Sequence, residues 1–259
     1  MATLPRMNAP TDLFDLSGRT AIVTGGSRGL GAEMVRAFAA QGANVVIASR
    51  KLENCEALAA EVTDAFGVRA LPVECHIGYW DQADALADAA IAEFGSIDIL
   101  VNNAGMSPLY PSLTEITEAL YDKTMEVNLK GTFRLSILMG DHMQAHGKGS
   151  IISVSSTAAV KPTPGEAVYA MAKAGLHNMT EMLSKAYGPE VRVNCIQPGP
   201  FLTDIAKAWD QEALKNIGAG LSLGRAGEPG EVVGAALYFA SDASSFTTGA
   251  ILRMDGGLR

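Results

Sequence analysis

Short, almost wholly apolar runs alternate along the chain with longer stretches in which apolar residues recur every three or four positions. The short runs are rich in β-branched residues and predict strands at 20–24, 44–49, 70–74, 97–102, 150–155, 191–197 and 250–254. The longer, alanine-rich stretches predict a helix ending near Gly42 and further helices at 51–66, 81–94, 117–145, 167–187 and 228–240. The alternation predicts an α/β fold in which a parallel sheet is covered by helices on both faces.

The same pattern predicts one domain, because no linker, repeat or low-complexity segment interrupts it. We expect this domain to span 16–259, after a flexible tail at 1–15 that has no periodicity. One long stretch, 199–227, is irregular and has a short helical patch between a Pro-Gly turn and a glycine-rich return. Long excursions of this kind often cover a site, so we expect a substrate lid here.

Composition and charge narrow the classes of function. The 259 residues carry a formal net charge of -8, which argues against a nucleic-acid partner or an anionic membrane surface. Cys55, Cys75 and Cys195 lack the spacing of a metal or redox motif, which indicates reduced thiols. We see no signal-peptide h-region and no run of about 20 apolar residues. We therefore expect a cytoplasmic protein.

A glycine-rich turn, Thr24-Gly25-x-x-x-Gly29-x-Gly31, joins the first predicted strand to the first helix. Glycines let such a turn adopt positive φ and approach a phosphate closely, while the helix N-terminus favours negative charge. Strand, turn and helix in this order are the setting of a dinucleotide-binding site. The predicted contacts are Gly25, Ser27, Arg28, Gly29, Leu30 and Gly31.

The end of the second strand predicts which dinucleotide is bound. A carboxylate there would bind the ribose hydroxyls of NAD and repel the extra phosphate of NADP. This chain instead has Ser49, Arg50 and Lys51, with Arg28 in the glycine turn, and we expect no acid to oppose these cations. Guanidinium groups bind phosphate bidentately, so the sequence favours NADP(H) over NAD(H). The alternative is that Arg50 and Lys51 only begin a solvated helix face.

Tyr169 and Lys173 lie four residues apart in a predicted helix, so both side chains can point into one pocket. A nearby cation favours the phenolate and lowers the phenol pKa from its usual value of about 10. In isolation such a pair is more typical of a partly exposed helix face. The other motifs decide in favour of a catalytic pair.

Taken together, these motifs resemble those of the short-chain dehydrogenase/reductase family, from Leu16 to Arg259. Further matches to the family pattern are Asn102-Asn103-Ala104-Gly105, Asn128, Ser156, which stands thirteen residues before Tyr169, Pro198-Gly199, Thr203 and Asp255-Gly256-Gly257. The resemblance implies a single doubly wound Rossmann domain with a seven-stranded parallel sheet. It also implies an NAD(P)(H)-dependent oxidoreductase that transfers hydride between nicotinamide and a ketone or secondary alcohol.

The resemblance assigns roles to individual residues. Tyr169 is the proton donor, Ser156 donates a hydrogen bond to the substrate oxygen, and Lys173 lowers the phenol pKa and binds the nicotinamide ribose. The backbone carbonyl of Asn128 holds a water that links the lysine to solvent. Further cofactor contacts are Asn103, Ala104, Gly105, Pro198, Gly199 and Thr203. Family members are usually homotetramers, here paired through the helices at 117–145 and 167–187.

Histidines mark the points where the chain departs from the family or suggests a metal. After the third strand members commonly have an aspartate that binds the adenine amino group, whereas here Cys75 precedes His76 and Ile77. We assign His76 and Ile77 to the adenine site, although a structural histidine is about as good an explanation of His76. His142 and His146 have a metal-like spacing but no third ligand, so we interpret them as a solvated helix end and assign no metal.

Three segments, 106–111, 157–166 and 201–209, are expected to line the substrate pocket. Their apolar residues are Met106, Leu109, Tyr110, Val160, Phe201, Leu202 and Trp209. They favour a medium-sized small-molecule carbonyl or alcohol, and Lys161 could bind an acidic tail on it. Two alternatives stay open. One is a 3-oxoacyl-[acyl-carrier-protein] reductase, and the other is a non-catalytic protein that binds NADP(H) as a sensor.

Overall fold

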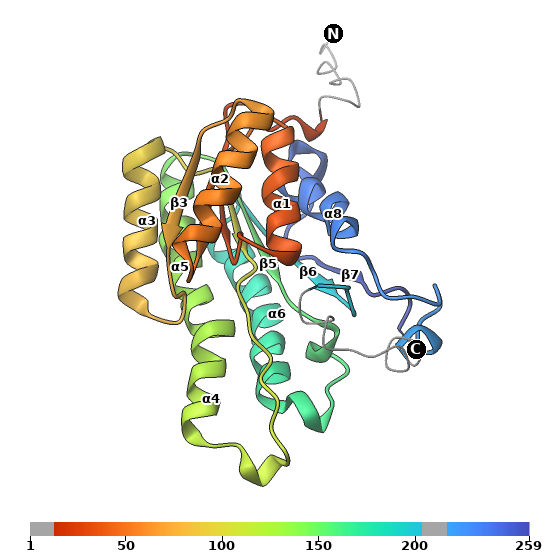
Figure 1. Ribbon diagram of the computed structural model, residues 1–259. Helices are drawn as coiled ribbons and strands as arrows, with labels where there is room; N and C mark the ends of the chain where they lie inside the picture. Colours follow the sequence, from red (N-terminus) through yellow and green to blue (C-terminus); the bar gives the residue numbers. More distant parts are fainter. Residues whose placement is uncertain (1–12, 204–216, 259) are drawn as a thin grey trace.

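The computed structural model describes residues 13–203 and 217–258, in which helices flank one sheet (Figure 1). The strands are β1 Thr20–Thr24, β2 Asn44–Ser49, β3 Ala70–Glu74, β4 Ile99–Asn102, β5 Gly149–Val154, β6 Val191–Pro198 and β7 Ile251–Met254. The α-helices are α1 Gly29–Ala40, α2 Leu52–Phe66, α3 Trp80–Phe94, α4 Glu118–Met125, α5 Gly131–Ala145, α6 Ala167–Tyr187 and α8 Val233–Ala240. A π-helical segment, Glu126–Lys130, joins α4 to α5, and 3-10 turns include Thr157–Ala159, Pro164–Glu166 and Pro229–Val232.

The seven strands lie in the order β3-β2-β1-β4-β5-β6-β7, and every pairing is parallel. This confirms the predicted doubly wound sheet. The strand order reverses between β1 and β4, so the connections on the two sides of this point leave in opposite directions. A crevice therefore forms at the carboxyl ends of these strands, which is where open α/β sheets bind ligands.

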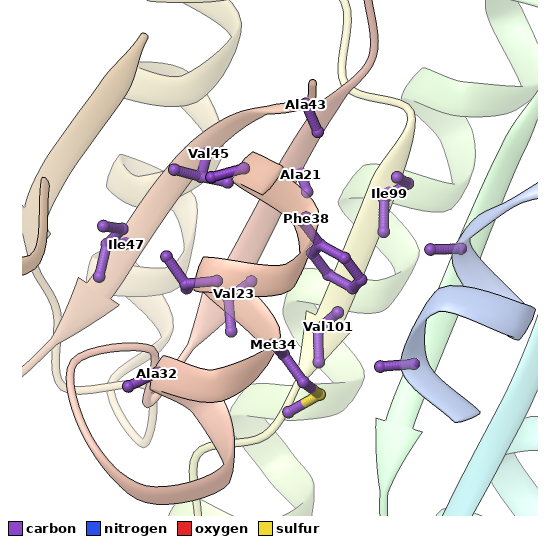
Figure 2. Packing of buried hydrophobic residues seen from close by; sticks show 14 of the residues in the cluster. Ala21, Val23, Ala32, Met34, Phe38, Ala43, Val45, Ile47, Ile99 and Val101 are labelled. Carbon is purple, nitrogen blue, oxygen red and sulfur yellow. The ribbon is translucent and has the colours of Figure 1, made fainter. Parts of the chain in front are cut away.

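Two hydrophobic cores fill the space between the sheet and its two helical layers. Along β1, Ala21 and Val23 face the layer of α1, α2 and α8, while Ile22 between them faces the layer of α3, α5 and α6. Figure 2 shows the first core, in which Phe38 and Met34 of α1 lie against residues of β1, β2 and β4. Burial on both faces explains why the strands are almost continuously apolar. The cores hold the strand ends, and therefore the crevice, in fixed register.

Apart from shifts of one residue at several ends, the predicted and observed elements differ in three places. The helix predicted at 117–145 contains the π-helical segment, and the predicted 228–240 helix begins as a 3-10 turn. The strand predicted from Ile97 starts at Ile99, because the Ile97 amide donates to Nε2 of His142 at 3.2 Å. Residues 1–12 of the predicted tail and 204–216 of the predicted lid lie outside the described residues. None of the helices in the described ranges has the length and hydropathy needed to cross a membrane.

Candidate active site

The glycine-rich turn between β1 and α1 has close contacts that only glycine permits. Gly25 and Gly29 have φ of 62° and 54°, in the left-handed region. A Cβ on Gly31 would lie 2.2 Å from the Gly25 carbonyl oxygen, so the first turn of α1 is in direct contact with the loop. The backbone is thus shaped as a cradle at a helix N-terminus. A cradle of this kind fits the pyrophosphate of a dinucleotide.

The end of β4 holds this cradle in place through Asn103. Its Nδ2 donates to the carbonyl oxygens of Thr24 at 3.0 Å and Gly25 at 3.1 Å. The Thr24 hydroxyl accepts hydrogen bonds from the amides of Asn103 and Ala104, at 3.1 and 3.2 Å. The turn and the β4 end therefore form one rigid unit. Asn103 was predicted as a cofactor contact, and the structure shows its side chain supporting the loop.

The predicted residues after β6 also meet this cradle. A Cβ on Gly29 would lie 3.7 Å from Cγ2 of Thr203, so Thr203 borders the glycine turn. A Cβ on Gly199 would lie 2.6 Å from Cβ of Asp255, which explains the glycine after Pro198. A hollow of about 280 Å³ lies here, lined by Ser27, Arg28, Gly29, Ala32, Glu33, Arg36, Leu202, Thr203 and Pro229.

Tyr169 and Lys173 lie in the first two turns of α6, close to the end of β5. The Lys173 ammonium is buried, donates to the Val154 carbonyl oxygen at 2.7 Å and lies 5.6 Å from the centroid of the Tyr169 ring. The backbone carbonyl of Lys173 accepts a hydrogen bond from the Ser155 hydroxyl at 3.1 Å. Ser156 interacts with the Tyr169 hydroxyl, an interaction that acts to lower the phenol pKa. The predicted catalytic trio is therefore together.

Burial shifts the pKa of both members of this pair. It raises the pKa of Tyr169 above its usual value, and the interaction with Ser156 acts in the opposite direction. It also lowers the pKa of Lys173 to about 8. Desolvation is the largest cause for both groups, while the Lys173 ammonium donates to the Val154 carbonyl oxygen. That Lys173 lowers the phenol pKa stays a prediction.

Asn128 is buried in the π-helical segment and ties it to the loop after β4. Its Oδ1 accepts from the Met106 amide at 3.1 Å, and its Nδ2 donates to the carbonyl oxygens of Met106 and Thr124, both at 2.8 Å. A Cβ on Gly105 would lie 2.9 Å from Asn128 Oδ1 and 3.4 Å from Lys173 Nζ. Asn128, Gly105 and Lys173 therefore converge on one point. π-Segments frequently occur at functional sites.

At the other end of the crevice, β2 ends in a cluster of polar groups. The Ser49 hydroxyl bonds to that of Ser27 at 2.9 Å, which joins β2 to the glycine turn. Arg28 and Arg50 are exposed and make no ion pair within 13–203 or 217–258. Glu74 of β3 is in register with Ser49, so one carboxylate lies on the strand next to these cations, without an ion pair to them in the described ranges. The sequence does not show which residues are paired across strands, so this neighbour could not be predicted from it.

His76 and Ile77 follow β3 and lie beside the helix that carries Asn128. The His76 ring stacks on Tyr79 with centroids 4.5 Å apart, and its Nδ1 is buried without a partner among the described residues. A Cβ on Gly131 would lie 1.6 Å from the Ile77 carbonyl oxygen, so this segment is packed directly on α5. A buried Nδ1 without a partner is compatible with the expected contact to an adenine ring, which carries donors and acceptors.

Only part of the predicted substrate rim is exposed. Leu109 and Val160 are 91% and 55% exposed, as rim residues are. Phe201 is 8% exposed and belongs to the core, where its ring lies against Gly227. Its assignment to the rim is therefore wrong. Trp209 lies outside the described residues.

Two polar interactions at the rim were not predicted. The Tyr110 hydroxyl is hydrogen bonded to the backbone at Pro164 and Ala167. The Lys161 ammonium, expected to bind a substrate tail, donates to the Leu258 carbonyl oxygen at 2.9 Å. Both partners are backbone groups of distant segments, for which the sequence carries no signal.

Comparisons with known proteins agree with this geometry. Residues 25–259 match a family model described as Enoyl-(Acyl carrier protein) reductase. The chain is 33% identical over 245 residues to Dehydrogenase/reductase SDR family member 4 of Pongo abelii, a match that covers 93% of this chain and 88% of the relative.

Two solved structures show the same fold. The NADPH-dependent 3-quinuclidinone reductase from Rhodotorula rubra has a TM-score of 0.92 at 30% identity, covering 99% of this chain and 97% of that one. A 7α-hydroxysteroid dehydrogenase complexed with NADH and 7-oxo glycochenodeoxycholic acid has a TM-score of 0.92 at 32% identity, covering 97% and 98%. The chain belongs to the short-chain dehydrogenase/reductase family and is an oxidoreductase that acts on CH–OH and C=O groups.

Proposed function

We propose that this protein transfers hydride between a nicotinamide dinucleotide, with NADP(H) favoured, and a ketone or secondary alcohol. The observation that carries the proposal is the convergence of Ser156, Tyr169 and Lys173 beside the glycine cradle. The cofactor, when bound, supplies or accepts the hydride. The residues that would hold it are those of the glycine turn, the β4 end and the segment after β6.

The side chains supply what carbonyl reduction needs besides hydride. A developing alkoxide requires a proton and a hydrogen-bond donor aimed at the same oxygen. In the proposed mechanism Tyr169 donates the proton and Ser156 the hydrogen bond. Lys173 is placed to bind the nicotinamide ribose, and the buried Asn128 fixes the loop and helix around it. In alcohol oxidation the same tyrosine oxygen accepts the proton.

Activity on a substrate panel tests the proposal. The panel should contain medium-sized apolar ketones, 3-oxoacyl thioesters and sugar ketones, with NADPH oxidation followed by absorbance. The exposed apolar residues Leu109 and Val160 support a hydrophobic ketone. Preferential turnover of acyl-carrier-protein thioesters would instead support the 3-oxoacyl reductase alternative. NADPH binding with no turnover of any class would favour a sensor.

The preference for NADP(H) is proposed from Arg28 and Arg50, two exposed guanidinium groups that make no ion pair within the described residues. We expect a higher catalytic efficiency with NADPH than with NADH. Replacing Arg50 with Ser should lower the NADPH efficiency by about tenfold or more, because a charged hydrogen bond is worth about 1.5–3 kcal/mol. The NADH efficiency should barely change.

Arg69→Ser is the matched control for this test, since it removes one guanidinium from just before β3, at the amino ends of the strands and away from their carboxyl ends. Its kinetic constants should match those of the wild type. An efficiency with NADH equal to or above that with NADPH would overturn the proposed preference.

His76 is proposed to contact adenine. Replacing it with Ala should raise the Michaelis constant for the cofactor by several-fold and leave kcat unchanged, because adenine lies far from the reacting carbon. Steady-state kinetics with varied NADPH measures both constants. An unchanged Michaelis constant would leave His76 as a structural residue stacked on Tyr79.

A homotetramer is proposed from two separate apolar surfaces. The α5–α6 face has a hollow of about 320 Å³ and the exposed Met171 and Met182. The edge strand β7 exposes Ile251 and Leu252, and Phe246 nearby is fully exposed. Two different self-pairing faces build a tetramer, as a dimer of dimers. Native mass by light scattering measures the assembly, and a monomer would contradict it.

The free, buried cysteines support the expected cytoplasmic setting.

A further inference from the structure

The hydroxyl of Tyr110 joins two walls of the substrate pocket. Tyr110 lies in the loop between β4 and α4, and its hydroxyl donates to the Pro164 carbonyl oxygen at 2.6 Å. The same oxygen accepts a hydrogen bond from the Ala167 amide, also at 2.6 Å. Ala167 is the first residue of α6, two positions before Tyr169. A side chain from one wall therefore holds the start of the catalytic helix.

This contact takes the place of a local helix cap. The first amides of an α-helix have no partner inside the helix and are usually capped by a Ser, Thr, Asp or Asn side chain just before it. The residue at this position, Glu166, gives no side-chain cap within the described residues. The phenol of Tyr110 supplies the missing acceptor from a segment more than fifty positions earlier in the chain.

The segment before α6, residues 157–166, is also attached at Lys161 to a distant part of the chain. Lys161 donates to the Leu258 carbonyl oxygen at 2.9 Å, and Arg253 donates to that oxygen at 2.6 Å. Leu258 in turn forms a bridge with Leu221, on the return of the predicted lid. The segment 157–166 links Ser156 to the helix of Tyr169 and is mostly exposed. Its position therefore depends on these two attachments, of which the one at Tyr110 is nearer to Tyr169.

We propose that Tyr110 is a positioning residue for Tyr169, an inference that rests on the proposed reductase function. Proton transfer needs the phenol oxygen within about 2.6–3.2 Å of the substrate oxygen. The Tyr110 hydroxyl is engaged by the backbone on both sides, so it acts on Tyr169 through the start of α6. It touches neither the cofactor cradle nor the Lys173 ammonium, whose partners lie in other segments.

The test is Tyr110→Phe, which removes the hydroxyl and keeps the ring. We expect kcat for the best ketone to fall about tenfold, because a small misplacement of a reacting group costs up to about a hundredfold. The Michaelis constant for NADPH should not change. The isotope effect with NADPH deuterated at the transferred position should rise, because the chemical step becomes slower than product release. A purely structural loss of folded enzyme would lower kcat and leave this isotope effect as it was.

The matched control is Tyr121→Phe, because Tyr121 is an exposed tyrosine of α4 whose hydroxyl has no hydrogen bond within the described ranges. It should behave as the wild type. Hydrogen exchange of peptides covering 164–172 gives a readout that needs no turnover, and we expect faster exchange in Tyr110→Phe only.

The outcomes separate the two proposals. An unchanged kcat and isotope effect in Tyr110→Phe, with an active wild type, would overturn the positioning role. A wild type that reduces nothing on the panel would overturn the proposed function, and the exchange data would then decide whether Tyr110 anchors the start of α6. Unchanged exchange would overturn that anchoring as well.

Discussion

Replacing Tyr169 with Phe is expected to lower kcat for ketone reduction by about 10²–10⁴-fold, the range that general acid catalysis contributes. The substitution removes the proton donor and leaves the ring in place. The glycine cradle, the Asn103 contacts and the Lys173–Val154 hydrogen bond do not involve the phenol oxygen. NADPH affinity, measured by fluorescence titration, should therefore stay close to that of the wild type.

Tyr238→Phe is the matched control, since it also removes one phenol oxygen, which in this case bonds to Thr247 at 2.8 Å beside α8. We expect it to lose about 1 kcal/mol of stability and no activity. If Tyr169→Phe kept the activity of the wild type, the proton would have to come from another group, and the assignment of Tyr169 would be wrong.

Burial acts on the protonation states that the proposed mechanism uses. Reduction would use the protonated phenol, which is already the ordinary form at neutral pH, and burial raises the pKa of Tyr169 further. Oxidation needs the phenolate, whose formation in the chain alone is opposed by the same burial. Lys173, with a pKa lowered to about 8, is the neighbouring group whose charge changes near neutral pH.

Local sequence was enough to predict most elements. The strands Thr20–Thr24, Asn44–Ser49 and Ala70–Glu74 and the helix Ala167–Tyr187 were predicted with the observed bounds. Each has an uninterrupted apolar run or a sustained helical period, so local preference and tertiary packing agree. The π-helical segment at Glu126–Lys130 could not be predicted, because helical periodicity does not change visibly there. It coincides with the hydrogen bonds of Asn128 to Met106, which exist only in the folded chain.

The residues of the candidate site were identifiable by their motifs, but their contacts were not. The sequence placed Lys173 near Tyr169 and led us to expect electrostatic coupling, whereas the buried ammonium is held by Val154 on a neighbouring strand. Glu74 was invisible as a neighbour of Ser49, because register between strands depends on the whole sheet. Tyr110 was predicted as part of an apolar rim, because its hydrogen bonds to the backbone at Pro164 and Ala167 exist only in the folded chain. Each of these contacts is a pairing between distant segments.

Replacing Gly31 with Ala is expected to lower NADPH affinity at least tenfold, a loss of about 1.4 kcal/mol in binding free energy. The new Cβ would lie 2.2 Å from the Gly25 carbonyl oxygen and 2.6 Å from Asn103 Nδ2. These two atoms form the hydrogen bond that closes the cradle, at 3.1 Å. A methyl group between them must push the turn away from α1. Overpacking of this kind also costs about 1–3 kcal/mol of stability, measurable by urea unfolding without cofactor.

Gly234→Ala is the matched control, because a Cβ there meets nothing within 4 Å on the exposed face of α8. The same substitution should raise stability by about 0.5–1 kcal/mol, since alanine favours helix more than glycine does, and leave NADPH affinity unchanged. Titrating NADPH into folded protein without urea measures affinity separately from stability. If Gly31→Ala bound NADPH as tightly as the wild type while losing stability, the glycine would serve helix–strand packing alone. If both fell together, the contact between α1 and the turn would be what shapes the pyrophosphate cradle.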